Sequence, residues 1–234
     1  MLTIEKTVLP SPEQWEIIIE GMRNPKNSWD RIDSNFESYD TSYCDHKCSI
    51  CPEFGQKCDC GIGENDHTLM MSLAKGGPVH AKYRRMIPVY VTINAPLYWW
   101  KEFDTYKVGT VANSCSTMHK IHAKEFDWDD FSCERLYVPM SENAFGEIIE
   151  ALNNARANFL ETNDKNYWYE MIQLLPSSYN QKRTVMLNYE VLVGIYKWRR
   201  NHKLDEWHTF CDWIESLPYS EIIIGDDNDG TESE

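Results

Sequence analysis

Long apolar runs and excess basic charge are both missing from this chain. No apolar stretch approaches the roughly 20 residues that a spanning helix needs, and the N-terminal residues lack the basic and apolar segments of a secretory signal. The 23 Lys and Arg residues stand against 37 Asp and Glu, a formal net charge of −14. Because phosphate neutralisation needs a basic surface, general nucleic-acid binding is not expected. We expect a cytoplasmic protein with no membrane role.

The composition is that of a folded protein. The chain has 234 residues, of which 42% are apolar and 13% aromatic, which excludes disorder throughout. We interpret residues 1–216 as one domain and residues 24–63 as a Cys-rich insertion within it. Residues 217–234 form an acidic tail that we expect to be disordered toward its end.

The residue pattern predicts an α+β fold, with a small antiparallel sheet and a mainly helical second half. Residues 3–8 alternate as a strand does, and Ser11 followed by Pro12 marks a helix start. Residues 86–93 read as a second strand, which Pro88 would place at an edge or a bulge. Helices are expected over 65–75, from a cap at Ser141, and over 164–174, 180–201 and 203–216.

Eight cysteines raise the question of metal binding. Five of them cluster in "CDHKCSICPEFGQKCDC", and without a secretory signal such clusters are more often metal ligands than disulfides. Cys48 and Cys51 have the Cys-x2-Cys spacing of a zinc half-site, and Cys58 and Cys60 would complete four thiolates. We expect a structural zinc ion there, with an iron–sulfur cluster or free thiols as the alternatives.

The segment "YWWKEFDTYKVGTVANSCSTMHK", residues 98–120, mixes large aromatics with hydroxyls, an amide, a thiol and an imidazole. This mixture suits a pocket that stacks a flat ligand and hydrogen-bonds its edge. Cys115 would be a nucleophile if His119 or Lys107 lowered its pKa. The competing interpretation is a half-buried, inert thiol, because free cysteine is among the most buried residue types.

A helix over 180–201 would align Asn188, Leu192, Ile195 and Arg199 on one face, which could line a cleft. Gly194 in mid-helix costs about 1 kcal/mol relative to Ala unless something approaches closely there. The alternative is that Asn188 and Arg199 make ordinary structural hydrogen bonds.

Over residues 64–216 the chain resembles the flavin-dependent thymidylate synthases. In that family a His precedes a strand that ends in Ala-Pro and an aromatic, as His80 precedes "MIPVYVTINAPLY". Leu175-Pro176, Asn188 and Arg199 match, at the same spacings, the family's Leu-Pro, its flavin-binding Asn and the Arg that reads the pyrimidine.

The resemblance implies a homotetramer that binds FAD and a pyrimidine deoxynucleotide, and that transfers a methyl or hydroxymethyl group from a folate. The residues it assigns fall into three groups. They are Arg199, Ser116 and Cys115 for catalysis, Asn188, His80, Tyr106 and Lys107 for the cofactor, and Lys101, Glu102, Ser114 and Arg199 for the substrate.

The chain departs from the family pattern at its cationic positions. The signature Arg-His-Arg is replaced by Thr105-Tyr106-Lys107, and Glu190 stands where the family has an Arg two residues after the flavin Asn. A carboxylate there would repel a diphosphate that an Arg would have gripped. These losses leave a second hypothesis, a non-catalytic relative that binds a nucleotide or a protein partner without flavin chemistry.

Overall fold

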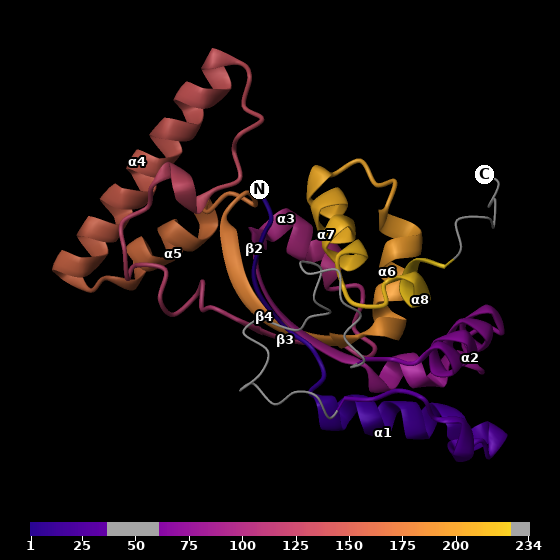
Figure 1. Ribbon diagram of the computed structural model, residues 1–234. Coiled ribbons are helices and arrows are strands. Elements are labelled where there is room, and N and C mark those ends of the chain that lie inside the picture. Colours follow the sequence, from indigo (N-terminus) through magenta and orange to yellow (C-terminus); the bar gives the residue numbers. More distant parts are fainter. Residues whose placement is uncertain (37–60, 226–234) are drawn as a thin grey trace, which may run out of the picture. The chain divides into compact units, whose positions relative to one another are not determined.

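The computed structural model describes residues 1–36 and 61–225. A four-stranded antiparallel sheet runs through it in the order β1-β2-β4-β3 (Figure 1). The strands are β1 (Thr3–Val8), β2 (Pro88–Pro96), β3 (Val111–Ser114) and β4 (Asn180–Asn188). The α-helices are α1 (Pro12–Arg23), α2 (Glu64–Lys75), α3 (Leu97–Phe103), α4 (Pro139–Thr162), α5 (Lys165–Leu174), α6 (Tyr189–Arg199), α7 (Asp205–Glu215) and α8 (Glu221–Ile224). Short 3-10 helices are η1 (Asn24–Lys26), η2 (Trp29–Arg31), η3 (Ala81–Met86) and η4 (Trp128–Asp130). This confirms the expected α+β class.

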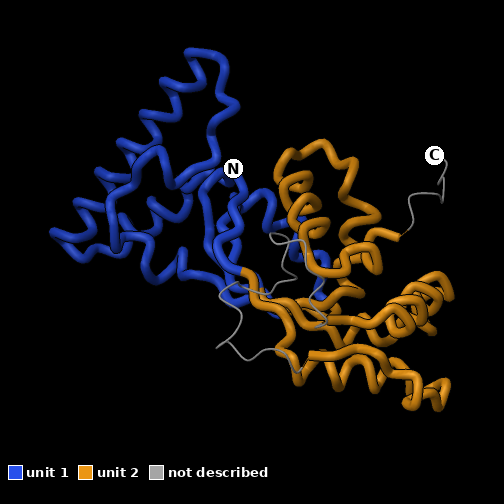
Figure 2. The backbone as a smooth tube through the Cα atoms, viewed as in Figure 1, with its two compact units in different colours: residues 1–6, 91–107, 111–185 blue, residues 7–90, 108–110, 186–234 orange. Residues whose placement is uncertain are grey.

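The described chain divides into two compact units (Figure 2). Unit 1 comprises residues 1–6, 91–107 and 111–185, and unit 2 comprises residues 7–90, 108–110 and 186–234, of which 7–36, 61–90, 108–110 and 186–225 are described. Strands β1, β2 and β4 each contribute residues to both units.

Unit 1 has an apolar core centred on α4 and α5. Buried side chains of α4, α5 and the segment before them pack together as one cluster, namely Ile121, Phe126, Phe131, Ile149, Leu152, Ala155 and Met171. The two helices pack against each other as a hairpin whose turn contains Asn163, with a left-handed φ of 55°. Asparagine adopts that conformation more readily than most residues do, so the reversal needs no glycine.

Unit 2 is organised around a buried carboxylate. Asp66 in α2 is fully buried and pairs with Arg23 of α1, which is 3% exposed. The other carboxylate oxygen of Asp66 accepts the backbone N–H groups of Asp33 and Ser34 and the Ser34 hydroxyl. Burial alone would raise the pKa of Asp66, but the hydrogen bonds from Ser34, Arg23 and the two backbone groups together lower it.

The chain leaves the described structure after Phe36 and returns at Gly61, and the residues at these two ends are joined. Asn35 and Gly61 form an antiparallel bridge, with N···O distances of 3.0 and 2.6 Å. The Phe36 ring stacks on Trp15 of α1 at 6.2 Å between centroids. The four expected zinc ligands, Cys48, Cys51, Cys58 and Cys60, lie outside the described residues, as does most of the expected insertion.

Three expectations about elements were wrong. Residues 180–188 form a strand, because "NQKRTVMLN" buries Gln181, Val185 and Leu187, which a strand places on one face, and the helix begins only at Tyr189. Pro88 does not mark an edge strand, since β2 lies between β1 and β4, and Pro88 is its first residue. The helix expected from Ser141 begins two residues earlier, at Pro139, with no side-chain cap.

Among the described residues, no helix is long and apolar enough to cross a membrane.

Replacing Asp66 with Ala should lower the free energy of unfolding by about 3–5 kcal/mol, because Arg23 would be left buried without its partner. Urea titration followed by tryptophan fluorescence measures the change. Glu5→Gln is the control, because its pair with Lys182 is exposed on both sides and is worth at most about 1 kcal/mol. A loss as small as that of the control would contradict the structural role of Asp66.

Candidate functional site

The residues that the sequence assigns to the site fall in both units. Unit 1 contains Lys101, Glu102, Tyr106, Lys107, Ser114, Cys115 and Ser116. Unit 2 contains His80, Asn188 and Arg199. Their proposed roles in binding and catalysis stay predictions.

The aromatic wall expected at the start of the 98–120 segment is core structure. Trp99 and Trp100 are both 0% exposed, and their rings pack edge to face at 4.8 Å and against Phe103 at 5.1 and 5.3 Å. The Trp100 indole N–H donates to the carbonyl of Gln181 on β4 at 2.8 Å. These two rings therefore fix α3 to the sheet, and the expectation that they stack a ligand was wrong.

Arg183 on β4 is a feature of unit 1 that sequence reasoning missed. Its guanidinium lies over the Trp100 ring at 4.3 Å and donates to Asp104 at 2.7 Å and to the Gln181 side chain at 2.9 Å. The alternation of residues 180–188 was the signal that could have placed it, because a strand puts Gln181 and Arg183 on the same face. Three contacts hold this half-buried cation in one orientation.

The polar segment over residues 111–116 is solvent-exposed. Every residue of β3 is exposed, and so are Cys115 and Ser116. The backbone N–H of Cys115 continues the ladder by donating to the carbonyl of Lys182 at 2.9 Å. The Ser116 hydroxyl accepts the N–H of His119 at 3.0 Å, which closes a turn. The interpretation of Cys115 as a half-buried thiol was therefore wrong, because the side chain is exposed. Its role as a nucleophile stays a prediction.

The other predicted side chains of unit 1 differ in exposure. Lys101 and Lys107 are exposed, whereas Glu102 and Tyr106 are half-buried. The Tyr106 ring lies 6.5 Å from that of Phe103. The two lysines are thus open to solvent as point charges, which can meet an anion but cannot form the bidentate fork of arginine.

In unit 2, Asn188 stands where the chain changes from strand to helix. Its side-chain oxygen accepts the N–H of Val191 at 3.1 Å, so it caps α6. Gly109, with φ of +78°, packs against this cap: a Cβ added there would lie 3.0 Å from Val191 Cγ2 and 3.3 Å from Asn188 Nδ2. The expectation that Asn188 lies on a helical face with Arg199 was wrong, because it precedes the helix.

Arg199 lies near the other end of α6. It is half-buried, and its guanidinium is 4.6 Å from the ring centroid of Trp207, which is fully buried in α7. The cation–π contact holds the planar guanidinium in one orientation. Gly194, which lies between Asn188 and Arg199 in the sequence, has open space beside it. A Cβ added there would meet no described atom within 4 Å.

Glu190 is paired with a cation that the sequence did not suggest. The Arg84 side chain on η3 is 9% exposed, and its Nη1 lies 3.7 Å from Oε2 of Glu190. Among the described residues, neither that oxygen nor Arg84 Nε has a hydrogen-bond partner, and the buried Thr110 hydroxyl has none either. Burial raises the pKa of neighbouring Tyr83 to about 12, and its hydroxyl donates to the carbonyl of Met70 at 2.8 Å.

These residues do not fit the diphosphate of FAD well. A diphosphate needs surplus positive charge, whereas Arg84 and Glu190 cancel each other in charge. The side-chain oxygen of Asn188 already accepts the N–H of Val191 as a helix cap. We therefore derive no reaction step through a flavin.

Within residues 1–36 and 61–225, no group of three or more His, Cys, Asp or Glu residues is arranged to hold a metal ion. The described Cys115, Cys133 and Cys211 are free thiols. The zinc prediction concerns other cysteines and stays a prediction.

The sheet order and the helical second half define an α+β fold that solved structures share, namely the fold of the flavin-dependent thymidylate synthases. No protein-family sequence model matches the chain, and no curated protein matches it in sequence.

Two of the similar solved structures are thymidylate synthase X (ThyX) from Helicobacter pylori with FAD and dUMP. One has a TM-score of 0.57 at 14% identity and covers 94% of each chain. The other has a TM-score of 0.55 at 15% identity and covers 94% of this chain and 95% of its own. A UMP/dUMP methylase, PolB, from Streptomyces cacaoi, bound with 5-Br dUMP, has a TM-score of 0.52 at 10% identity, covering 92% and 88%.

A double-mutant cycle with Arg84→Met and Glu190→Gln should give a coupling energy of about 0.5–3 kcal/mol, because each single change leaves the partner's charge poorly compensated. Chemical denaturation of the four proteins measures it. Lys182 and Glu5 are the control pair: they lie closer, at 2.7 Å, but both are exposed, so their coupling should stay below about 1 kcal/mol. Additive effects of the Arg84 and Glu190 changes would disprove the pairing.

Proposed function

We propose that the chain binds a pyrimidine deoxynucleotide and transfers a one-carbon group to it from a folate. The observation that carries the proposal is the fold, shared over more than nine-tenths of the chain with three structures that hold dUMP or a brominated dUMP. Arg199, fixed against Trp207, is the residue that we propose to contact the pyrimidine. A homo-oligomer, a tetramer by resemblance, is part of the same proposal.

The oxidation level of the transferred group separates two versions of the reaction. A folate methylene carbon can become a hydroxymethyl group when one pyrimidine C–H bond breaks, a C–C bond forms and water supplies the hydroxyl. That reaction needs no electron donor. Methyl transfer needs two further electrons, which a reduced flavin would supply. Since the residues of unit 2 fit the flavin diphosphate poorly, hydroxymethyl transfer is the version that they favour.

The alternative function is nucleotide binding without catalysis. It is favoured by the same Arg84–Glu190 neutralisation and by the solvent exposure of Ser114, Cys115 and Ser116, because catalysis by such groups usually takes place where water is excluded.

Visible absorbance of the purified protein, before and after adding FAD, distinguishes these possibilities. Under hydroxymethyl transfer or simple binding, we expect no flavin bands and no change when FAD is added. Mass spectrometry of deoxyuridylate and deoxycytidylate incubated with methylene-tetrahydrofolate then reports whether a product forms. Flavin bands together with a methylated product would overturn the hydroxymethyl version, and no product with intact binding would leave the non-catalytic function.

Arg199→Ala should weaken deoxyuridylate binding by about ten- to a hundredfold, the value of a charged hydrogen-bond donor. Calorimetric titration measures the affinity, and the melting temperature should stay within a few degrees. Lys197→Ala is the matched control, because Lys197 is an exposed cation of the same helix, 5.4 Å from the Trp198 ring. Equal affinities in the two variants would rule out the role of Arg199.

A further inference from the structure

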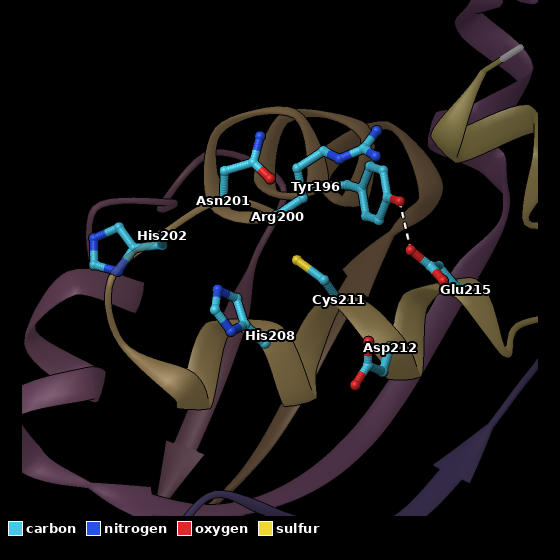
Figure 3. A pocket seen from close by; sticks show the side chains of 8 residues that line it. All are labelled: Tyr196, Arg200, Asn201, His202, His208, Cys211, Asp212 and Glu215. Atoms are coloured by element: carbon cyan, nitrogen blue, oxygen red, sulfur yellow. Dashed lines mark hydrogen bonds between the residues drawn. The ribbon is translucent and has the colours of Figure 1, made fainter. Parts of the chain in front are cut away.

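The C-terminal end of α6, the following loop and α7 border an open cavity of about 490 Å³ within unit 2 (Figure 3). Arg199 does not line it. All eight lining side chains carry a polar or titratable group: Tyr196, Arg200, Asn201, His202, His208, Cys211, Asp212 and Glu215. This volume lies within the ~300–1,000 Å³ of small-molecule sites.

The spacing of most of these residues along the sequence places them on two helical faces that border the cavity. Those of α7, from His208 to Glu215, are spaced by three, one and three, which places them on one helical face. Tyr196 on α6 and Arg200, the C-cap residue of that helix, are spaced by four and likewise share a face. Faces through which helices pack are usually apolar, since burial of apolar area drives packing. Tyr196 and Cys211 are buried, whereas Arg200, His208, Asp212 and Glu215 are exposed, so these two faces border a hydrated cavity.

The lining side chains include two carboxylates, Asp212 and Glu215, and one guanidinium, Arg200, and the two signs lie on different walls. Asp212 and Glu215 belong to α7, whereas the opposite wall comes from a segment, residues 191–204, that contains four Lys or Arg and no Asp or Glu. Arg200 is the cation of that segment that lines the cavity. Figure 3 shows the carboxylates on α7 and the Arg200 and Asn201 side chains across from them. A ligand with both an anionic end and a donor end would meet both walls.

Several of the lining groups are already held in place. Tyr196, 5% exposed, donates its hydroxyl to Glu215 at 2.5 Å, and Arg200 lies 5.2 Å from the centre of the same ring. His202 Nδ1 accepts the N–H of Leu204 at 3.2 Å, which leaves Nε2 as the protonated donor of the neutral ring. Burial raises the pKa of the Cys211 thiol to about 12, so this thiol stays uncharged.

We propose that this cavity binds a small phosphorylated molecule that carries an amino group, in the size class of a pyrimidine nucleotide such as deoxycytidylate. The phosphate oxygens would accept hydrogen bonds from Arg200, the Asn201 amide and the imidazoles. The exocyclic amine would donate to Asp212. An apolar ligand does not suit a cavity in which every side chain is polar.

Calorimetric titration with deoxycytidylate of the full chain, saturated beforehand with deoxyuridylate, tests the proposal. The two nucleotides differ in whether the base carries an amine or a carbonyl. We expect deoxycytidylate to bind without displacing deoxyuridylate. Asp212→Asn and Arg200→Met should each weaken this binding by about ten- to a hundredfold. Both side chains are exposed, so both variants should fold.

Two controls isolate the cavity. Lys197→Met removes a cation of α6 that does not line it, and Glu150→Gln removes an exposed acid of α4, and neither should change the affinity. The proposal is overturned if deoxycytidylate only displaces deoxyuridylate, if the two cavity variants bind normally, or if inorganic phosphate binds as tightly as deoxycytidylate. If deoxyuridylate itself fails to bind, the proposed function fails, while deoxycytidylate binding and its loss in Arg200→Met still decide the present proposal.

Discussion

A carboxylate removed from water must be compensated, and in unit 2 the compensation of Asp66 determines how the chain is arranged. Its two oxygens hold Arg23 of α1 and the backbone at Asp33 and Ser34, so one side chain joins α1, α2 and the segment that leads to Phe36. The bridge between Asn35 and Gly61 lies next to that anchorage. It joins the segment that ends at Phe36 to the segment that begins at Gly61. The α1–α2 part of the fold depends on this polar centre, and apolar packing alone does not explain it.

Local capping and composition were sufficient to predict much of the fold. Ser11 and Pro12 marked the start of α1, and the structure contains the complete capping box there. The strand-to-helix change at Asn188 was missed because Asn188, Leu192, Ile195 and Arg199 satisfy a helical spacing by coincidence, while pairing with β2 and β3 decides the conformation of residues 180–188. Strand formation is a tertiary effect, and a window of sequence does not contain the partner strand.

The same limit explains what was missed at the candidate site. Burial of Trp99 and Trp100 could not be inferred from their position before a polar run. The strand that Trp100 contacts, β4 at Gln181, lies 81 positions further along the chain. Glu190 was identified from the sequence as a repelling charge, but its partner Arg84 is distant in sequence, and only the packing of η3 against α6 joins them. Charges predicted one at a time therefore give the wrong electrostatics when their partners are distant.

Net charge and local charge lead to different conclusions about anionic ligands. A formal charge of −14 opposes an extended polyanion, whose binding energy accumulates over many phosphates. A single phosphate requires only a few converging donors, and residues 191–204 provide a stretch without acids in which Arg199 and Arg200 contact different aromatic rings. Because successive helical residues point about 100° apart, the two guanidinium groups serve different surfaces of α6. An acidic protein can thus present two separately oriented arginines, one against Trp207 and one beside the cavity, without becoming a nucleic-acid-binding protein.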